Sequence, residues 1–249
     1  MPDREILGVR VSGMGQEELE QDLLSCVRGN TKSLFAYVNV HAVNTARRDP
    51  RFREILNSSH ISYCDGEGVR LGARILGWRL PRRIVLTYWI WDLCALFEKE
   101  GVSIFLLGAR PGVAEYAASR LVSSFPHLRI AGVHPGYFNK EGAENDSVIA
   151  AIEKASPDVL FVGFGMPLQE LWVEENFRRI TARAILTAGS MIDYVAGVKK
   201  TTPGWMADHG MEWLYRLAQD PVRLWKRYLL GNPVFLFKIL MRRGSTRET

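Results

Sequence analysis

Short apolar runs alternate along the first 198 residues with longer segments in which apolar residues recur at helical spacing. Leu19, Leu23 and Leu24 show that helical spacing within residues 16–28, whereas residues 102–107 form an almost continuous apolar run. Continuous apolar runs of this length are typical of strands that are buried on both faces, as in parallel sheets. The alternation therefore predicts an α/β fold, with a mostly parallel sheet flanked by helices.

The same pattern gives approximate bounds for each element. We expect strands over residues 6–11, 33–40, 61–64, 102–107, 128–134, 159–162 and 184–187. We expect helices over residues 16–28, 41–57, 69–76, 90–99, 112–124, 143–155 and 167–178. The one clear change of composition lies near Lys199. It predicts a core over residues 1–198 and a helical C-terminal appendage over residues 199–249. Pro221 and Pro233 break this appendage into pieces, and each is suited to an N-terminal helix position.

Composition narrows the class of protein without naming a function. The chain has 249 residues, of which 47% are apolar and 24% charged, ordinary values for a globular protein with a sizeable core. Its three cysteines, Cys26, Cys64 and Cys94, are scattered and form no CxxC pair. This spacing suggests neither a disulfide framework nor a zinc site, and it favours a reducing compartment. The sequence shows neither a signal peptide nor an apolar run near the roughly 18 residues of a spanning helix.

Positive charge is concentrated in the appendage. Residues 199–249 carry a net charge of +6, while the whole chain carries +5. Such a basic segment favours a polyanionic partner, namely an anionic membrane, a diphosphate or a nucleic acid. Large apolar residues such as Trp213, Trp225 and Tyr228 lie between the cations, which is typical of an interfacial membrane segment. Ordinary docked helices remain an alternative; a nucleic-acid partner is least favoured, since the cations form no exposed stripe.

The first candidate for chemistry is Asp65. It follows the predicted strand 61–64 and precedes Gly66 and Gly68, with a predicted helix after them. A carboxylate at the carboxyl end of a parallel strand can face a ligand crevice, and glycines let a substrate approach the backbone. The alternative is a plain turn, because Asp-Gly is a common turn dipeptide.

Three glycine-rich turns follow other predicted strands. They contain Gly108 and Arg110; Gly163, Gly165 and Pro167, with Gln169 and Glu170 in the first turn of the next helix; and Gly189 and Asp193. None matches the Walker A or the dinucleotide-binding pattern. Taken singly, each is readily explained as an ordinary turn between a strand and a helix. Together at one edge of a parallel sheet, they favour a nucleotide-like ligand.

The ordered set of these motifs carries a resemblance. It runs through Asn39, the Asp65–Gly68 turn, Arg83, residues 107–115, Gly136–Phe138, residues 163–170, residues 189–197, Glu212–Leu217 and Pro221–Arg223. In this order and across residues 6–228, the chain resembles the WecG/TagA/CpsF glycosyltransferases (glycosyltransferase family 26). The resemblance implies a Rossmann-like fold whose C-terminal appendage helps to complete the active site at the membrane.

The resemblance also implies an activity. Such enzymes move a sugar, typically N-acetylmannosamine, from a UDP donor to a polyprenyl-diphosphate-linked GlcNAc acceptor, with inversion and without metal or cofactor. They work at the cytoplasmic face of the bacterial membrane, as peripheral proteins, in the synthesis of cell-wall and surface polysaccharides. The sequence is also compatible with a homo-oligomer in which the tail covers a neighbour's pocket.

Residue roles follow from this chemistry. On the family pattern Asp65 matches the base that takes the proton from the acceptor hydroxyl. Without a DxD motif, arginines and helix N-termini must stabilise the departing diphosphate. Candidates are Arg83 and the tail residues Arg216, Arg223 and Arg227, for which a solvated basic face is the alternative. Gly163, Gly165, Gln169 and Glu170 are assigned to the uridine-diphosphate end, and Asn39 to the acceptor or donor sugar.

The sequence departs from the family pattern in three places. Residues 83–92 are longer and more aromatic than usual, Tyr37 stands where many members carry threonine, and residues 199–203 replace an Arg-Ala-Pro run. Two other functions remain open: a soluble nucleotide-sugar transferase with a non-lipid acceptor, and a non-catalytic nucleotide-binding α/β module. His41 lies close to the proposed site, although a histidine at a helix start is more often structural.

Overall fold

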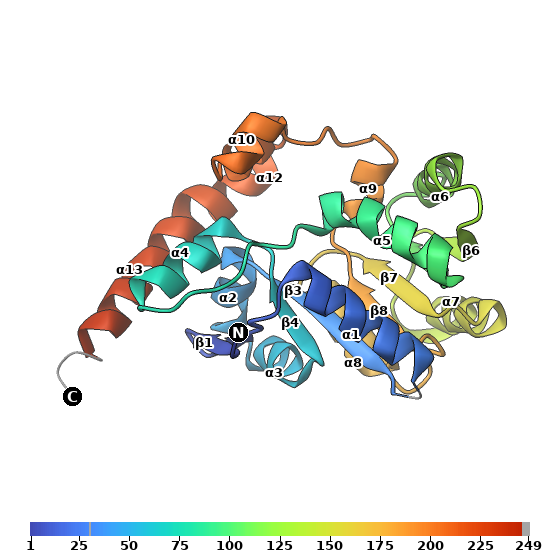
Figure 1. The fold of residues 1–249 in the computed structure, drawn as a ribbon, viewed down its shortest axis with the longest axis horizontal. Helices are drawn as coiled ribbons and strands as arrows, with labels where there is room; N and C mark the ends of the chain where they lie inside the picture. Colours follow the sequence, from blue (N-terminus) through green and yellow to red (C-terminus); the bar gives the residue numbers. More distant parts are fainter. Residues whose placement is uncertain (30, 246–249) are drawn as a thin grey trace.

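The computed structural model describes residues 1–29 and 31–245, and its centre is a six-stranded parallel sheet (Figure 1). The strand order is β4-β3-β8-β7-β5-β6. Their bounds are β3 Ser33–Val38, β4 Ile61–Cys64, β5 Ser103–Gly108, β6 Arg129–His134, β7 Val159–Gly163 and β8 Ala184–Thr187. Every neighbouring pair in this sheet is parallel, so all six carboxyl ends lie along one edge. The α/β prediction is confirmed.

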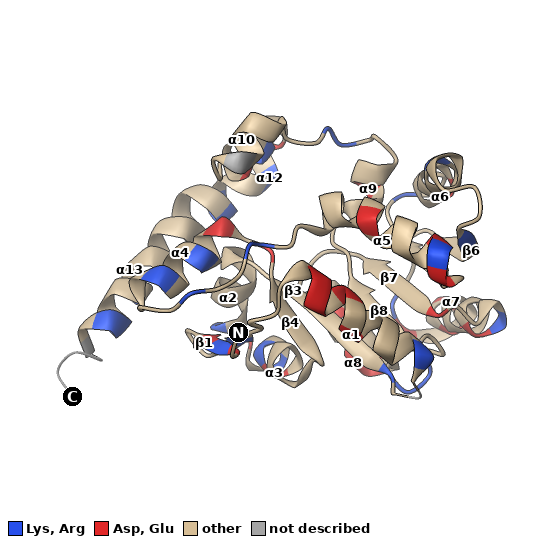
Figure 2. Cartoon of the chain, viewed as in Figure 1, with Lys and Arg blue, Asp and Glu red and all other residues tan. Residues whose placement is uncertain are grey.

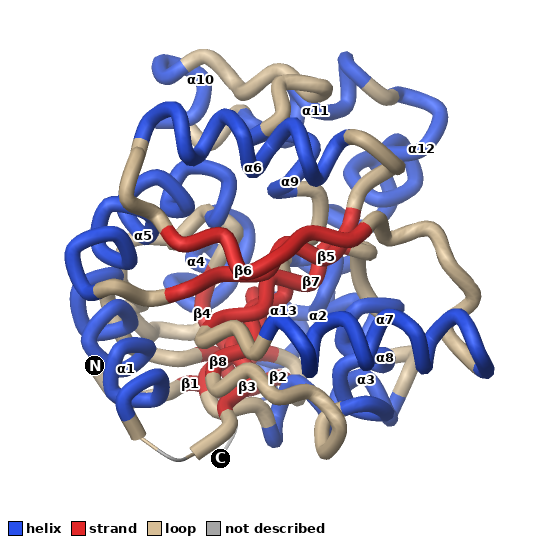
Figure 3. Tube along the Cα trace, turned by 90° about the vertical axis from the view of Figure 1, so that its right-hand side faces the viewer, coloured by secondary structure: helices blue, strands red, loops and turns tan. Residues whose placement is uncertain are grey.

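Helices cover both faces of the sheet (Figure 3). One face packs against α1 (Gln16–Arg28), α5 (Leu86–Glu100), α6 (Val113–Ser124) and α9 (Met191–Val195). The other face packs against α3 (Pro50–Ser58), α7 (Gly142–Ala155) and α8 (Leu168–Asn176). The helices α2 (Val40–Ala46) and α4 (Glu67–Ile75) lie at the β4 end.

Burial on both faces explains the continuous apolar runs in the sequence. In β5, Ile104 and Leu106 join the cluster under α5 and α6, while Phe105 and Leu107 join the cluster under α7 and α8. Because successive side chains in a strand point to opposite faces, a strand covered on both sides needs apolar residues at every position.

Two N-terminal predictions were wrong in detail. The expected strand over residues 6–11 is a hairpin of β1 (Arg4–Ile6) and β2 (Val9–Val11). Leu7 and Gly8 both have positive φ, which matches the tight two-residue turn that twisted hairpins prefer. The expected helix over residues 41–57 is divided into α2 and α3, because Asp49 caps a new helix that has Pro50 in its first turn.

Three further element bounds differ from the predictions. The helix expected from residue 90 begins at Leu86, and the turn after β8 contains the short helix α9. Pro167 was expected as the first residue of a helix, but it is the residue before α8. At the start of α5, Leu86 and Thr87 lead directly into the aromatic run of residues 88–91, where periodicity does not separate helix from loop.

The tail is mostly helical between residues 204 and 245. It contains α10 (Gly204–Asp208), α11 (Glu212–Gln219), α12 (Pro221–Trp225), the π-helical segment η1 (Lys226–Leu230) and α13 (Gly231–Ser245). Pro221 begins α12 as expected, capped by the Asp220 carboxylate. The matching prediction for Pro233 was wrong, because α12, η1 and α13 follow one another without interruption. Proline removes one backbone donor and crowds the preceding turn, and the wider π turn directly before it accommodates both effects.

The inner face of α13 is part of the core. Phe235 and Ile239 are fully buried in one cluster with Ala42 of α2 and Val69 of α4. At Gly72 of α4, a Cβ atom would lie 2.7 Å from the Phe235 ring, so this glycine permits the close approach of the two helices. The docked-helix alternative therefore describes the inner face of α13, and the division at residue 199 stays a prediction.

Candidate active site

Two cavities meet at the carboxyl edge of the sheet. The first has a volume of about 1350 Å³ and extends over the turns after β5, β7 and β8. The second has a volume of about 590 Å³ and lies between α4 and the tail helices. Five residues line both cavities: Asn39, His41, Asp65, Arg216 and Arg227. A group held in either cavity can therefore approach the same carboxylate.

Asp65 lies at the centre of this shared wall. Its backbone N–H donates to the carbonyl oxygen of Val38 at 3.0 Å, which extends the β3–β4 pairing by one step. The Asn39 side chain donates from Nδ2 to Asp65 Oδ2 at 3.3 Å, while its Oδ1 accepts from the Ala42 N–H and caps α2. Asn39 thus orients the carboxylate. It also lines both cavities, so its contact with a sugar stays a prediction.

The surroundings of Asp65 make it more basic than an ordinary aspartate. Burial raises the pKa of Asp65 to about 6, while Arg216, the Asn39 hydrogen bond and Arg83 oppose that rise and Glu212 adds to it. A carboxylate with a pKa of about 6 is still mostly ionised near neutral pH. It also holds a captured proton more firmly than an exposed aspartate does.

Arg216 of α11 is the cation that lies nearest to this chemistry. Its guanidinium lies 5.5 Å from the centre of the Tyr194 ring. Burial disfavours its charge, but Tyr194, Tyr228 and Asp65 outweigh that effect and raise the pKa of Arg216. It therefore stays charged and can stabilise an anion in either cavity.

A histidine, His41, lines both cavities together with Arg216 and Arg227. Burial, together with the nearby charge of Arg227, lowers the pKa of His41 to about 4. His41 is therefore uncharged near neutral pH and leaves Asp65 as the basic group of the shared wall.

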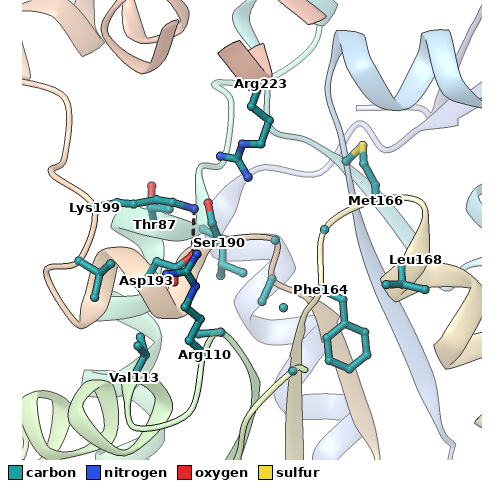
Figure 4. Close-up of a pocket in the computed structure, with 18 of the residues that line it drawn as sticks. Thr87, Arg110, Val113, Phe164, Met166, Leu168, Ser190, Asp193, Lys199 and Arg223 are labelled. Carbon is teal, nitrogen blue, oxygen red and sulfur yellow. Dashed lines mark hydrogen bonds and ion pairs between the residues drawn. The ribbon is translucent and has the colours of Figure 1, made fainter. Parts of the chain in front are cut away.

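The first cavity contains a second group of cations (Figure 4). Arg110 from the turn after β5, Lys199 after α9 and Arg223 of α12 point toward one region beside Ser190. Lys199 pairs with Asp193 at 2.9 Å, and Arg223 pairs with Asp220 at 2.6 Å. Arg110, Asp193 and Arg223 were predicted as site residues from the sequence, and all three line this cavity. Lys199 was not predicted, because its position in the cavity depends on the path of the loop after α9.

Gln169 and Glu170 were expected to line the pocket, but both are fully buried beneath it. Gln169 Oε1 accepts from the backbone N–H groups of Gly165 and Gly189 at 3.1 and 3.0 Å. Its Nε2 donates to Glu170 Oε1 at 2.7 Å. Gln169 thus ties together the turns after β7 and β8, which fixes the floor of the cavity.

The glycine-rich turns have different uses. Gly163, Gly165 and Gly189 line the first cavity, whereas Gly108 and Pro167 do not. At Gly108 a Cβ atom would lie 2.6 Å from the Gly163 carbonyl oxygen, so this glycine lets two strand ends approach closely. Gly189 has a φ of +55° and lies against the Tyr37 hydroxyl. In the turns after β7 and β8, a ligand in the first cavity can therefore approach the glycine backbone.

Arg83 lines the second cavity, and its guanidinium contacts residues of the tail. It donates to the carbonyl oxygen of Ala207 at 3.0 Å and forms an ion pair with Glu212. Its Nε also lies 3.8 Å from the Glu67 carboxylate at the start of α4. In this arrangement Arg83 holds α10 and α11 against the core, whereas the sequence placed it on the diphosphate.

Sequence reasoning missed an aromatic corner of the first cavity. Phe138 and Phe164 meet edge to face with ring centres 5.7 Å apart. The Lys140 ammonium lies 3.5 Å and 4.3 Å from the centres of these two rings, and burial lowers its pKa to about 8. An aromatic ring with a nearby cation suits a planar ligand group that carries polar oxygens. The aromatic residue at 138 in the Gly136–Phe138 segment was the available signal.

The second cavity is more apolar. Its walls include Val40, Leu71, Trp213, Leu229 and Leu236, from α2, α4 and the tail helices. Arg83, Arg216 and Arg227 line the same cavity, as does Asp65. An amphiphilic ligand with an anionic head and an apolar tail would match both parts.

A parallel sheet with helices on both faces and a ligand cavity at its carboxyl edge defines an α/β protein of Rossmann-like architecture. Sequence comparison then gives the family. The sequence model of the WecG/TagA/CpsF family of glycosyl transferases matches residues 4–249. The chain belongs to this family, as the ordered motifs predicted, and is a glycosyltransferase.

Curated relatives agree with this assignment. A protein of Bacillus subtilis (strain 168) is 32% identical over 209 residues, covering 84% of this chain and 79% of the relative. A protein of Staphylococcus aureus (strain MRSA252) is 29% identical over 222 residues, covering 88% of this chain and 84% of the relative. Both are named N-acetylglucosaminyldiphosphoundecaprenol N-acetyl-beta-D-mannosaminyltransferase.

Proposed function

We propose that this chain transfers N-acetylmannosamine, or a related sugar, from a UDP donor to a polyprenyl-diphosphate-linked GlcNAc acceptor. The observation that carries the proposal is the position of Asp65 in the wall shared by a cationic cavity and an apolar cavity. The names of the two relatives support the choice of acceptor and sugar.

The two substrates take different cavities. The aromatic corner at Phe138 and Phe164 suits the uracil ring, and the cations Arg110, Lys199 and Arg223 suit the diphosphate of the donor. The acceptor enters the second cavity, with its first isoprene units against the apolar wall and its own diphosphate near Arg216 and Arg227.

The reaction is a single displacement. Asp65 accepts the proton of the acceptor hydroxyl as that oxygen forms a bond to the anomeric carbon of the donor sugar. The bond between the anomeric carbon and the UDP oxygen breaks, and UDP leaves with the electron pair. Attack from the side opposite to the leaving group inverts the anomeric configuration.

Arginines and lysine supply the charge that a metal supplies in other transferases. The basic residues Arg110, Lys199, Arg216 and Arg223 all line the donor cavity. Among residues 1–29 and 31–245, the one group of three potential metal ligands is Asp22, Cys26 and His60, and none of them lines either cavity. The four cations support metal-independent transfer, because fixed positive charges can stabilise the departing diphosphate.

The tail supports the peripheral-membrane part of the proposal. From Pro221 to Ser245 the sequence contains no acidic residue (Figure 2). The same stretch exposes large apolar side chains: Val222, Trp225, Leu229, Leu230, Val234, Phe237, Leu240 and Met241. No helix in the described part of the chain is long and apolar enough to cross a bilayer. A basic helix with an exposed apolar face suits binding in the plane of an anionic membrane surface, at the cytoplasmic face where lipid-linked intermediates are built.

UDP release from a panel of UDP-sugars tests the proposal directly. The acceptor is a short-chain prenyl-diphosphate-GlcNAc, no metal is added, and wild type is compared with Asp65→Asn. We expect acceptor-dependent turnover with UDP-ManNAc that falls at least 100-fold in the variant, the lower end of what a positioned base contributes. Anomeric configuration of the product, read by NMR, tests inversion.

Other results would contradict particular parts. Turnover that survives in Asp65→Asn would remove Asp65 as the base and keep the reaction class. Turnover with free GlcNAc derivatives as efficient as with the prenyl diphosphate would favour the soluble transferase. Nucleotide binding without turnover for any donor and acceptor, in the presence of anionic vesicles, would favour a non-catalytic module.

A further inference from the structure

The edge of the sheet opposite Asp65 contains a second chemical cluster. His60 directly precedes β4, while Asp22 and Cys26 lie one turn apart on α1. His60 Nε2 lies 2.6 Å from Asp22 Oδ2 and 3.6 Å from Cys26 Sγ. These ligand atoms all lie within 4.8 Å of one another. The proposed reaction uses none of the three residues.

We propose that Asp22, Cys26 and His60 form a binding site for a borderline transition-metal ion of the Zn²⁺ type. Thiolate, imidazole and carboxylate are the three side chains that bind Zn²⁺ in proteins. The cysteine spacing pointed away from a zinc site in the sequence, because no CxxC pair is present. Folding supplies the missing ligands from α1 and from the residue before β4.

The distances agree with this coordination. Tetrahedral Zn²⁺ with ordinary bond lengths places a sulfur and a nitrogen ligand roughly 3.6 Å apart and a nitrogen and an oxygen ligand roughly 3.3 Å apart. The sulfur–nitrogen separation already has that value. The nitrogen–oxygen pair, 2.6 Å apart, must open by roughly 0.7 Å as the ion replaces their hydrogen bond. Binding also displaces the thiol proton to solvent.

The surroundings permit an ion to enter and hold the ligands in place. The His60 side chain is 39% exposed and that of Asp22 is 27% exposed, whereas Cys26 is buried at the base. The His60 ring meets Phe35 of β3 edge to face with ring centres 5.4 Å apart. Arg10 donates to the His60 carbonyl oxygen at 3.2 Å, which fixes the backbone at this point. Three protein ligands leave the fourth position of the ion to water.

A metal here would join α1 to the start of the strand that ends beside Asp65. The site lies at the opposite end of β4 from the two cavities, so its effect is on folding stability. An ion that binds the folded chain and not the unfolded chain stabilises the fold by mass action. The inference is independent of the proposed transferase reaction, and either can fail alone.

Metal binding by the untagged full chain tests the site. Zn²⁺ is titrated against a chromophoric chelator, and Co²⁺ is used as a spectroscopic probe, for wild type, His60→Gln, Cys26→Ser and the control His127→Gln. His127 is exposed and lies outside the cluster. We expect one Zn²⁺ per chain, a thiolate-to-Co²⁺ charge-transfer band and at least tenfold weaker binding in His60→Gln, with no change in the control.

Because His60 is exposed, we expect the variant His60→Gln to fold. Should Cys26→Ser fail to fold, His60→Gln still gives the comparison, and Zn²⁺ should raise the melting temperature of wild type but not of this variant. Equal Zn²⁺ affinity in wild type and His60→Gln would overturn the proposal, as would Co²⁺ binding without a thiolate band. In either case the cluster would be only an Asp–His pair beside a buried thiol.

Discussion

Asn39 Nδ2 lies 3.3 Å from Asp65 Oδ2, so the residue that caps α2 also supports the carboxylate at the end of β4. The two side chains come from neighbouring parallel strands that end at the same edge. The hydrogen bond favours the ionised carboxylate and holds the pKa of Asp65 below the value that burial alone would give.

The pH profile of the reaction should report this pair. With Asp65 as the base, kcat/KM should fall as the pH drops through about 6, because the carboxylate becomes protonated there. Asn39→Ser keeps a capping oxygen but loses the amide donor, so it should move this acid limb to higher pH. Steady-state rates between pH 5 and 8 measure both. An acid limb unchanged in Asn39→Ser would contradict the coupling.

The donor cations should show in binding. Arg110→Gln and Lys199→Gln each remove one charged donor from the first cavity and should weaken UDP binding about tenfold, since a hydrogen bond to a charged group contributes about 1.5 kcal/mol or more. Calorimetric titration with UDP measures the change. Arg243→Gln, at an exposed position on α13, is the matched control and should bind UDP like wild type.

Phe235 and Phe237 offer a matched pair on the two sides of α13. Phe235 is fully buried, so Phe235→Ala should lower the free energy of unfolding by about 3 kcal/mol or more. Phe237 is 61% exposed, so Phe237→Ala should change stability by less than about 0.5 kcal/mol. Urea denaturation measures both.

The same pair tests the membrane surface. Phe237→Ala should reduce sedimentation with anionic vesicles about tenfold, because burial of one phenylalanine side chain contributes about 1.5 kcal/mol or more. Removal of residues 199–249 is unsuitable as a control, since it also removes Phe235 from the core. Vesicle binding that is equal in Phe237→Ala and wild type would place the membrane contact elsewhere.

The ion pair between Arg83 and Glu212 should matter for the position of the tail. Both side chains are largely buried, at 15% and 11% exposure, so breaking the pair leaves an uncompensated charge. Glu212→Leu and Arg83→Met should each destabilise the fold by about 3 kcal/mol, and the double variant that combines them should recover much of this loss. A double-mutant cycle on urea-denaturation data measures the coupling. Additive effects would show that Arg83 does not act through Glu212.

The raised pKa of Glu170 should make the free energy of unfolding depend on pH. Burial raises its pKa from the ordinary 4.5 to about 7 in the folded chain. Between these values the unfolded chain loses the proton and the folded chain keeps it, so stability falls as the pH rises through this window. Relative to Glu170→Gln, wild type should lose about 3 kcal/mol between pH 4.5 and 7. Parallel stability curves for the two proteins would contradict the buried carboxyl.

Sequence reasoning predicted the fold best where burial on both faces left continuous apolar strands. It failed at short-range features such as the Leu7–Gly8 turn, where the positive φ of Leu7 follows from pairing within the hairpin. Pro233 was assigned a helix start because its local preference is strong, yet a π turn lets the helix continue. Tertiary context decided both cases.

The candidate site shows the same division. Asp65 and the glycine-rich turns could be found, because strand ends and glycines have local signals. Gln169 was found as a motif residue, but its burial beneath the pocket depends on two turns that only the fold joins. His60 was missed because its partners lie on a helix more than thirty positions earlier. Lys199 was missed because no local signal shows that the loop after α9 turns back into the cavity beside Asp193.

The contact between Gly72 and Phe235 has a consequence for how far the enzyme can reach. The helix that faces the proposed membrane surface rests on α4, and α4 follows directly after Asp65 and Gly66. On the proposed orientation, the packing of α13 against α4 holds the Asp65 carboxylate at a fixed height above the lipid headgroups. We expect a lipid-linked sugar at that height to be within reach and the end of a longer lipid-linked glycan to lie beyond it, which would limit addition to one sugar.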